Sequence, residues 1–298
     1  MATPFRLQLA GAAVAAVLVA GAACVDITGF ARFVDREEKR FTVSGKPSVS
    51  VSTFDGAIDI RASDRQEIVV TIEKRASSKE EADRIEVHAE QNGNRIVVDV
   101  RMPKTAHAFG FHQSAGARLI VTVPASSDVE AHSGDGSIDI ERVSGTLDLR
   151  SGDGSIDGRE LGGSVKVHTG DGSIKMVGVN GTLDADTGDG SINAEGKFSS
   201  VRARSGDGSV TVHATAGSSA SDEWTISTGD GSVLLEVPDG FGGELDAHTG
   251  DGGIDVHDVT LSNVTGRISR DTVRGRLGNG GAAVKVRTGD GTITLRRS

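Results

Sequence analysis

Apolar and polar residues alternate in short segments along most of this chain. Within Ser133–Arg150, the segments Ser-Ile-Asp-Ile and Thr-Leu-Asp-Leu each place every second side chain on the same side. An alternation of period two is typical of a β-strand that buries one face. Helical patterns are nearly absent, although Ser78–Glu81 has the form of a capping box and predicts a short helix that ends near Ile85. We therefore predict an all-β protein.

A turn motif, Gly-Asp-Gly, separates these segments at regular intervals. Its first five copies are 18 residues apart and the later ones are spaced more widely, with starts at Gly134, Gly152, Gly170, Gly188, Gly206, Gly229, Gly250 and Gly289. An early relative of the motif begins at Phe54. Apolar columns keep the same interval, as in Leu147, Val165, Leu183 and Val201. Two short strands and two turns account for one repeat.

Two architectures fit this repeat. In a β-solenoid each repeat is one coil, and equivalent residues stack about 4.8 Å apart. In an antiparallel meander each repeat is a hairpin, and a separate layer has to cover the apolar face of the sheet. Because the chain has almost no helical pattern to supply that layer, we predict a single-chain β-solenoid of about 18 residues per repeat. Ile156, Ile174 and Ile192 should then form one inward stack.

The chain divides into four regions. We expect a signal peptide in residues 1–23, a tether in 24–40, a less regular strand-rich cap region in 41–124, and the Gly-Asp-Gly solenoid in 125–298. The cap region either closes the solenoid or is a small domain that merges into it. An interruption of the repeat at Val259–Ala283 predicts a long loop or an irregular coil, and its arginines are Arg267, Arg270, Arg274 and Arg276.

The N-terminus predicts export. Arg6 precedes an apolar run from Leu9 to Ala20, which is too short for a comfortable membrane span and is typical of a secretory signal. Cys24, the single cysteine, follows Gly-Ala-Ala and resembles the residue that becomes lipidated in bacterial lipoproteins, although Gly21 replaces the usual large aliphatic residue. Ordinary cleavage at the preceding alanines is the alternative. We expect an envelope protein, anchored to the membrane if Cys24 is modified and otherwise periplasmic or secreted.

The composition limits the core and the partners. The 298 residues include 41 Gly, no Tyr and 3% aromatic residues, so the core must consist of small and β-branched side chains. A formal net charge of −10 disfavours nucleic acid and electrostatic attraction to anionic lipid. A single Cys excludes an internal disulfide framework. We expect an envelope protein or a glycan as the partner.

The central residue of each motif forms a column of acids: Asp135, Asp153, Asp171, Asp189, Asp207, Asp230, Asp251 and Asp290. In a solenoid these carboxylates would lie about 5–6 Å apart and repel by roughly 1 kcal/mol in water. Either Ca²⁺ binds them, or each Asp accepts backbone N–H bonds in its turn. Basic residues two positions before the motif support the second explanation: His132, Arg150, His168, Arg204, His248 and Arg287. We expect turn chemistry and no cofactor, with weak Ca²⁺ sites as the alternative.

Other chemical signatures are weak. His107 and His112 lie in a glycine-containing loop, and no histidine has the paired spacing of a metal site. The calcium-binding nonapeptide pattern fails because Ile138 occupies the position where it needs Asp. Every coil carries the same Asp, whereas a catalytic site needs an exceptional one, and no serine-hydrolase elbow is present. We predict no enzyme activity; a glycan-processing β-helix enzyme and an accessory subunit in envelope signalling are the alternatives.

The chain resembles a bacterial family of unknown function, the candidate adhesins with β-strand repeats. The features that match are the Phe41-Thr42-Val43 opening, the first turn at Thr53–Ile58, the strand Leu119–Pro124, the Gly-Asp-Gly-Ser-Ile repeats and the closing segment Gly289–Leu295. Together they cover about residues 41–298. The resemblance implies a non-enzymatic, adhesin-like structural or binding role, and it carries over no catalytic residue.

Overall fold

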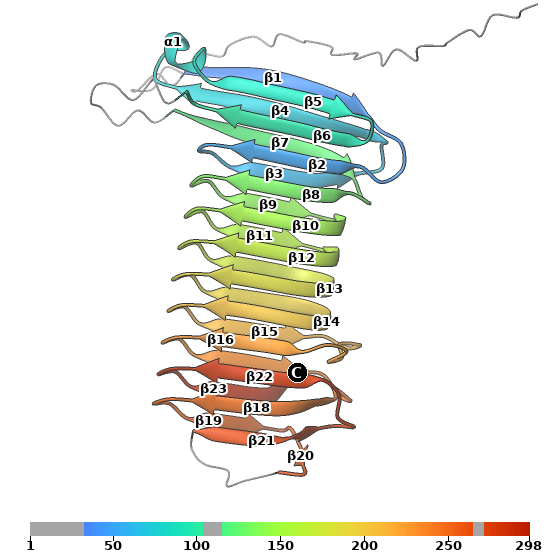
Figure 1. Ribbon diagram of the computed structural model, residues 1–298, viewed down its shortest axis with the longest axis vertical. Coiled ribbons are helices and arrows are strands. Elements are labelled where there is room, and N and C mark those ends of the chain that lie inside the picture. The colour runs from blue at the N-terminus through green and yellow to red at the C-terminus, as the bar shows by residue number, and fades with distance from the viewer. Residues whose placement is uncertain (1–32, 104–114, 265–270) are drawn as a thin grey trace, which may run out of the picture.

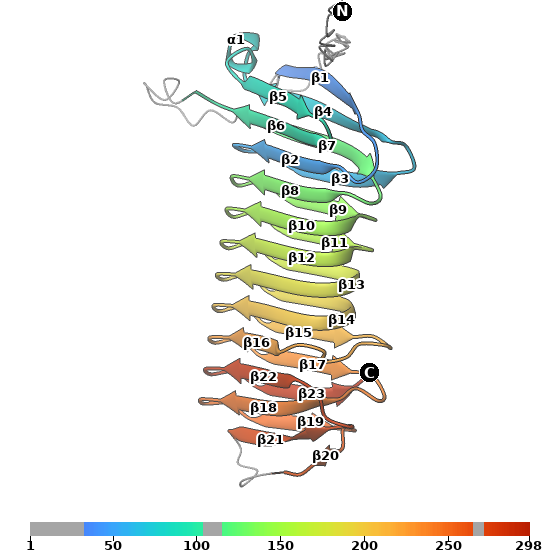
Figure 2. The same cartoon turned by 45° about the vertical axis from the view of Figure 1, so that its right-hand side comes forward.

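The structure is a computed structural model that describes residues 33–103, 115–264 and 271–298. In these residues the chain forms a tall, flattened column of stacked strands (Figure 1, Figure 2). Each coil consists of a strand, a turn and a second strand, and the chain then returns to begin the next coil. The prediction of an all-β, solenoid-like fold is confirmed.

The two strands of each coil belong to two different sheets, and neighbouring coils pair in parallel within each sheet. The first sheet contains, in spatial order, β6 (Arg95–Arg101), β2 (Ser48–Thr53), β8 (Asp128–Ser133), β10 (Ser144–Ser151), β12 (Gly162–Thr169), the second halves of β13 (Ile174–Thr187) and β14 (Ile192–Ser205), β16 (Trp224–Thr228), β22 (Ala283–Thr288) and β18 (Gly243–Thr249). The second sheet contains β7 (Gly116–Pro124), β3 (Ile58–Ser63), β9 (Ile138–Glu141), β11 (Ile156–Arg159), the first halves of β13 and β14, β15 (Val210–Ala214), β17 (Val233–Val237), β23 (Ile293–Arg297) and β19 (Ile254–His257).

Equivalent residues of successive coils lie side by side in the middle of the column. Leu147 pairs with Val165, which pairs with Leu183, so neighbours differ by 18 in number. The predicted inward stack of Ile156, Ile174 and Ile192 is present. β13 and β14 each run from the second sheet of one coil into the first sheet of the next, which joins the two sheets into one hydrogen-bonded network.

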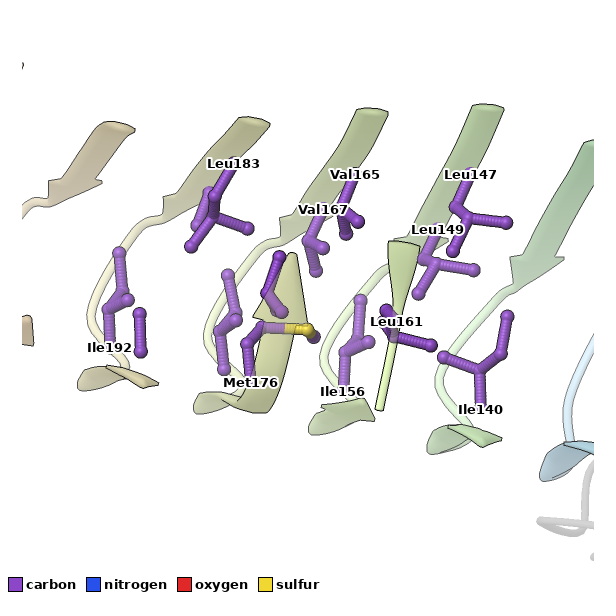
Figure 3. Close-up of a cluster of buried hydrophobic side chains, with 14 of the residues drawn as sticks. Ile140, Leu147, Leu149, Ile156, Leu161, Val165, Val167, Met176, Leu183 and Ile192 are labelled. Carbon is purple, nitrogen blue, oxygen red and sulfur yellow. The ribbon is translucent and has the colours of Figure 1, made fainter. Parts of the chain in front are cut away.

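A thin apolar core fills the space between the sheets (Figure 3). Leu147 and Leu149 of the first sheet point towards Ile140 and Ile156 of the second, and all four are buried. Each such side chain stabilises the fold by about 1.5–3 kcal/mol relative to exposure. The single Trp, Trp224, lies in a longer coil further along the column. It makes edge contacts with Phe198 and Phe241 at centroid distances of 6.1 and 5.1 Å.

The spatial order of the coils differs from the chain order at both ends. The first coil, β2–β3, lies between the β6–β7 strands and the β8–β9 coil. The last coil, β22–β23, lies between the β16–β17 coil and the β18–β19 coil. The first and last coils of the chain are therefore both enclosed within the column.

Antiparallel strands cap the two ends. At the N-terminal end β5 (Glu86–Asn92) pairs with β6, β4 (Glu67–Ala76) with β7, and β1 (Phe33–Thr42) with β4. At the other end β21 (Thr272–Leu277) pairs with β18, and β20 (Leu261–Ser262) pairs with β21. The interruption at Val259–Ala283 thus contains a capping strand, whose Arg274 and Arg276 form ion pairs with Asp246 and Glu244. Arg267 and Arg270 lie outside the described residues.

Two regional boundaries differ from the prediction. Residues 33–40 of the expected tether belong to β1, because their charged side chains form cross-strand ion pairs: Arg36 with Glu73 at 2.6 Å and Arg40 with Glu67 at 2.8 Å. A charged edge strand also resists pairing with other chains. The solenoid begins before residue 125, since β2–β3 already forms a coil whose turn stacks against the turn at Gly134.

The helix α1 spans Lys79–Ala82, which is shorter than predicted. Ser78 caps it as expected and accepts a hydrogen bond from the Glu81 amide at 3.2 Å. In the described part of the chain, no helix has the length and apolar character needed to cross a bilayer. The predicted signal peptide, Cys24, His107 and His112 lie outside the described residues.

Candidate functional site

The Gly-Asp-Gly turns form one edge of the column, where successive backbones approach closely. The Gly152 amide donates to the Gly134 carbonyl oxygen at 2.5 Å, and the same bond recurs along the edge. A Cβ at Gly154, the second glycine of its motif, would overlap the carbonyl oxygen of Gly136. No glycine of the eight motifs has a positive φ. The motif therefore needs glycine because the coils touch, and not because the turn is left-handed.

A column of buried hydroxyl groups runs behind the glycines. It consists of the residue before each motif: Ser133, Ser151, Thr169, Thr187, Ser205, Thr228, Thr249 and Thr288. Each hydroxyl donates to the carbonyl oxygen of the second turn glycine of a neighbouring coil at 2.7–2.9 Å. In five turns it also accepts from its own second glycine, as in Gly154 to Ser151 at 3.0 Å. The hydroxyls thus make the turn hydrogen bonds that we expected of the aspartates.

The eight aspartates of the motif are exposed along the same edge. Among the described residues, none of their carboxylates has a side-chain hydrogen bond or an ion pair within 4.0 Å. At the early turn, burial and the neighbouring charge of Asp135 raise the pKa of Asp55. The column is a solvated row of like charges, and weak Ca²⁺ binding to it stays the alternative to our prediction of no cofactor.

The basic residues before the motifs do not neutralise this row. Arg150 pairs with Asp148 of its own strand at 2.7 Å, and Arg287 pairs with Asp246 of a neighbouring strand at 2.6 Å. Their position in the alternation places them on the outer face of the first sheet, so they pair across that face. The expected compensation of the Asp column by these cations is therefore wrong.

The outer face of the first sheet carries a shallow depression in the middle of the column. Its lining comes from β10, β12, β13 and β14 and comprises Arg150, Lys166, Val167, His168, Asp184, Asp186, Arg202 and Arg204. The strand register brings these residues together. Lys166 of β12 lies opposite Asp184 of β13, and Asp184 lies opposite Arg202 of β14. Side chains that are 18 residues apart in the sequence thus form one continuous surface.

The charges of this depression are only partly paired. His168 contacts Asp186 at 3.1 Å, between Nδ1 and Oδ1. Lys166, Arg202 and Arg204 are exposed, and among the described residues no carboxylate lies within ion-pair distance of any of the three. The protein as a whole is acidic, so three cations without an ion pair among the described residues, Lys166 on β12 and Arg202 and Arg204 on β14, are a local exception. The depression, which we call the cationic depression, can attract an anionic group.

The opposite sheet carries an acidic patch nearer the N-terminal end. Asp59, Asp139 and Asp157 lie in register on the outer face of β3, β9 and β11. Burial raises the pKa of Asp139, and the neighbouring charges of Asp157 and Asp59 raise it further. Arg118 compensates Asp59 through an ion pair at 2.6 Å. The two outer faces thus differ in charge.

From the spacing of the histidines we predicted no metal centre. Over residues 33–103, 115–264 and 271–298, no three His, Cys, Asp or Glu side chains converge as ligands of one ion. His132 and His168 are exposed on the first sheet. The cationic depression was missed at the sequence level, although its cations stand at outward positions of successive repeats.

Comparison with known proteins gives the following likenesses. The family model described as Toastrack DUF4097 matches residues 48–296. A candidate adhesin from Bacteroides fragilis shares 13% identity over 88% of this chain and 97% of its own, with a TM-score of 0.42. One from Parabacteroides merdae shares 14% over 87% and 95%, with a TM-score of 0.38. No curated protein matches the chain.

Proposed function

The chain belongs to the Toastrack family, and from that premise we propose that it is a non-enzymatic, adhesin-like binding module of the cell envelope. Its ligand contacts the cationic depression on the first sheet. One observation carries the proposal: Lys166 of β12 and Arg202 and Arg204 of β14 stand exposed on the two coils beside β13, with no carboxylate within ion-pair distance among the described residues. The strand ladder fixes the backbone positions of these cations, so binding has to order their side chains but not the chain that carries them.

The chemistry of the surface favours an acidic glycan. Interfaces between proteins usually have an apolar or aromatic centre. The only apolar residue in the depression, Val167, is buried, and no aromatic side chain lines it. An uncharged sugar would have no platform on which to stack, so recognition must come from charge-assisted hydrogen bonds to carboxylate or phosphate groups.

Polygalacturonate, whose sugars carry carboxylates, is a suitable probe, with uncharged dextran as its control. We expect the purified protein to bind polygalacturonate and not dextran, and added salt to weaken the binding. Reversal of two cations, Arg202→Glu with Arg204→Glu, should reduce affinity at least about tenfold. Lys175→Glu reverses a single charge on the opposite sheet and should change little. Equal binding by the two variants would refute the proposal.

Export and anchoring are part of the same proposal and rest on residues outside the described ranges. Residues 1–23 act as a signal peptide, and lipidation of Cys24 holds the mature protein on the membrane. Wild type should partition into the detergent phase, and Cys24→Ser should move it to the soluble fraction. Identical fractionation of the two, with a mature N-terminus other than Cys24, would exclude lipidation.

A further inference from the structure

The last coil of the chain fills a slot between two coils that precede it. β22–β23 bonds to both neighbours: the Gly289 amide donates to the Gly229 carbonyl oxygen at 2.6 Å, and the Gly250 amide donates to the Gly289 carbonyl oxygen at 2.7 Å. In Figures 1 and 2 this red coil lies between orange ones. The hydroxyl column continues through it, since Thr288 donates to the Gly231 carbonyl oxygen at 2.7 Å and Thr249 to that of Gly291 at 2.8 Å.

The inserted coil is cationic, and the coils beside it present acids to it. The ion pairs are Lys285 with Glu223 at 2.7 Å, Arg287 with Asp246 at 2.6 Å, Arg297 with Asp239 at 3.0 Å, and Arg296 with Glu236. Glu236 also accepts a hydrogen bond from His213 of β15. The slot is therefore matched to this coil by charge as well as by its backbone ladder.

One short segment joins the inserted coil to the strand that precedes it. Residues 278–282 pass from β21, on one edge of β18, to β22, on the other edge. Gly278, Gly280 and Gly281 have φ values of 50°, 81° and 157°, so this connection has a backbone that other residues rarely adopt. The enclosed coil at the other end, β2–β3, differs because β1 and β4 tether it on both sides and pair with each other.

We propose that the slot also accepts the C-terminal coil of a second copy of this chain, so that two copies exchange residues 283–298 and form a dimer. Every ladder bond and ion pair of the coil is the same in the exchanged dimer, and only the path of residues 278–282 changes. Exchange of an identical element is a low-cost route to a dimer for this reason. The surface that recognises the partner is the pair of acidic coil edges that border the slot.

Two complementary full-length variants test the exchange. One carries Glu223→Lys with Asp239→Lys, which reverses the slot, and the other carries Lys285→Glu with Arg297→Glu, which reverses the coil. Both pairs are exposed, so each variant should fold. Each is mismatched with itself, but the two match in an exchanged heterodimer. After joint incubation just below the melting temperature, native mass spectrometry should show the heterodimer enriched at least about threefold above the proportion expected for random pairing of the two variants.

A control mixture separates exchange from simple attraction between opposite charges. Arg40→Glu mixed with Glu67→Arg reverses an ion pair between β1 and β4, where no coil can leave its place. Both variants of this mixture keep the native slot and coil, so homodimers and heterodimer should form in the proportion expected for random pairing. The proposal is overturned if the slot and coil variants stay monomeric or show no enrichment of the heterodimer above that proportion, or if the control mixture shows the same enrichment.

Discussion

The middle of the column and its C-terminal end use the same coil in different ways. From β8 to β14, each coil is followed in space by the next coil of the chain, and equivalent side chains stack at one interval. At the C-terminal end the coil order is rearranged, and four ion pairs surround the inserted coil. The turn glycines and the buried hydroxyls are the same in both regions.

This difference shows that the residues that specify the conformation of a coil are not the residues that specify its position in the column. The alternation, the glycines and the hydroxyls specify a coil, but they are nearly identical in every repeat. They cannot distinguish one slot from the next. The charges that differ between coils, such as Arg287 opposite Asp246, supply that distinction at the C-terminal end.

The largest effect should come from a carboxylate placed in the core of the middle region. Ile174 is 1% exposed, and Ile174→Asp should destabilise the fold by about 4 kcal/mol or more, because a charge would be buried without a partner. The equivalent residue of the end coil, Ile254, is only half-buried, and Ile254→Asp should cost less than half as much. Urea unfolding measures both. Lys175→Asp, which faces solvent, is the control, and a cost equal to that of Ile174→Asp would refute the strand register.

The next effect tests the close approach of the turns. Gly154→Ala should destabilise by more than about 2 kcal/mol, since its Cβ would overlap the Gly136 carbonyl oxygen and force two coils apart. A Cβ added at Gly253 of the end coil would meet no atom within 4 Å, and Gly253 has no positive φ, so Gly253→Ala should change stability by less than about 0.5 kcal/mol. Thermal unfolding of the two variants checks this; similar losses would contradict the steric explanation.

Acid should affect the two regions in opposite directions. Burial opposes ionisation of Glu236, but hydrogen bonds from His213 and Arg296 outweigh it and lower its pKa. Asp246 behaves alike: burial opposes its ionisation, and Arg287 and Arg274 lower its pKa. A lowered pKa in the folded state gives stability that is present at neutral pH and is lost as pH falls below about 4. The protection of β23 from hydrogen exchange, measured relative to the intrinsic exchange rate at each pH, should therefore decrease in acid, and Glu236→Gln should weaken this response.

The acidic patch should respond with the other sign. The pKa of Asp139 is raised in the folded state, so its charge destabilises the fold at neutral pH, and protonation removes that cost as pH falls towards about 4. β9 should keep its protection from exchange under conditions where β23 loses it. Asp139→Asn should stabilise the protein at neutral pH and have little effect in acid. Equal acid sensitivity of β9 and β23 would contradict these assignments.

The smallest effect concerns the Asp column. Asp171 is exposed and accepts no side-chain hydrogen bond in the described structure, so Asp171→Asn should change stability by less than about 0.5 kcal/mol and relieve some repulsion. Millimolar Ca²⁺ should shift the melting temperature of wild type and variant equally. A large Ca²⁺-dependent rise that Asp171→Asn weakens would instead identify the column as a cation site.

The alternation carried most of the information about the fold. It predicted the strands, the solenoid-like stacking and the inward positions of Ile156 and Ile174, because period-two burial depends only on local sequence. The spatial order of the coils was not predictable in the same way. Thr288 and Gly289 belong to the same motif that the preceding coils carry. The pattern therefore shows that this segment forms a coil, but it does not show which slot the coil fills.

The sites were less predictable for related reasons. The hydroxyl column was visible as a Ser or Thr before every motif, yet the charge of the aspartates made them the more obvious candidates for turn bonding. A buried hydroxyl can satisfy two backbone groups where space is tight: Ser151 donates to the Gly136 carbonyl oxygen and accepts from the Gly154 amide. The cationic depression depends on outward side chains of several strands at once. Only the register of the ladder brings Lys166 and Arg202 onto one surface.

The rearranged coil order also affects when, during synthesis, folding of the column can be completed. Because the chain is synthesised from its N-terminus, β18–β19 is made before β22–β23. β18 cannot take its final neighbours until residues 283–288 arrive, because β22 lies between it and β16. A product that stops short of residue 283 would keep open strand edges at this point, and proteases recognise such unfinished backbone. Closure of the column at this end therefore requires residues 283–297, which fill the slot.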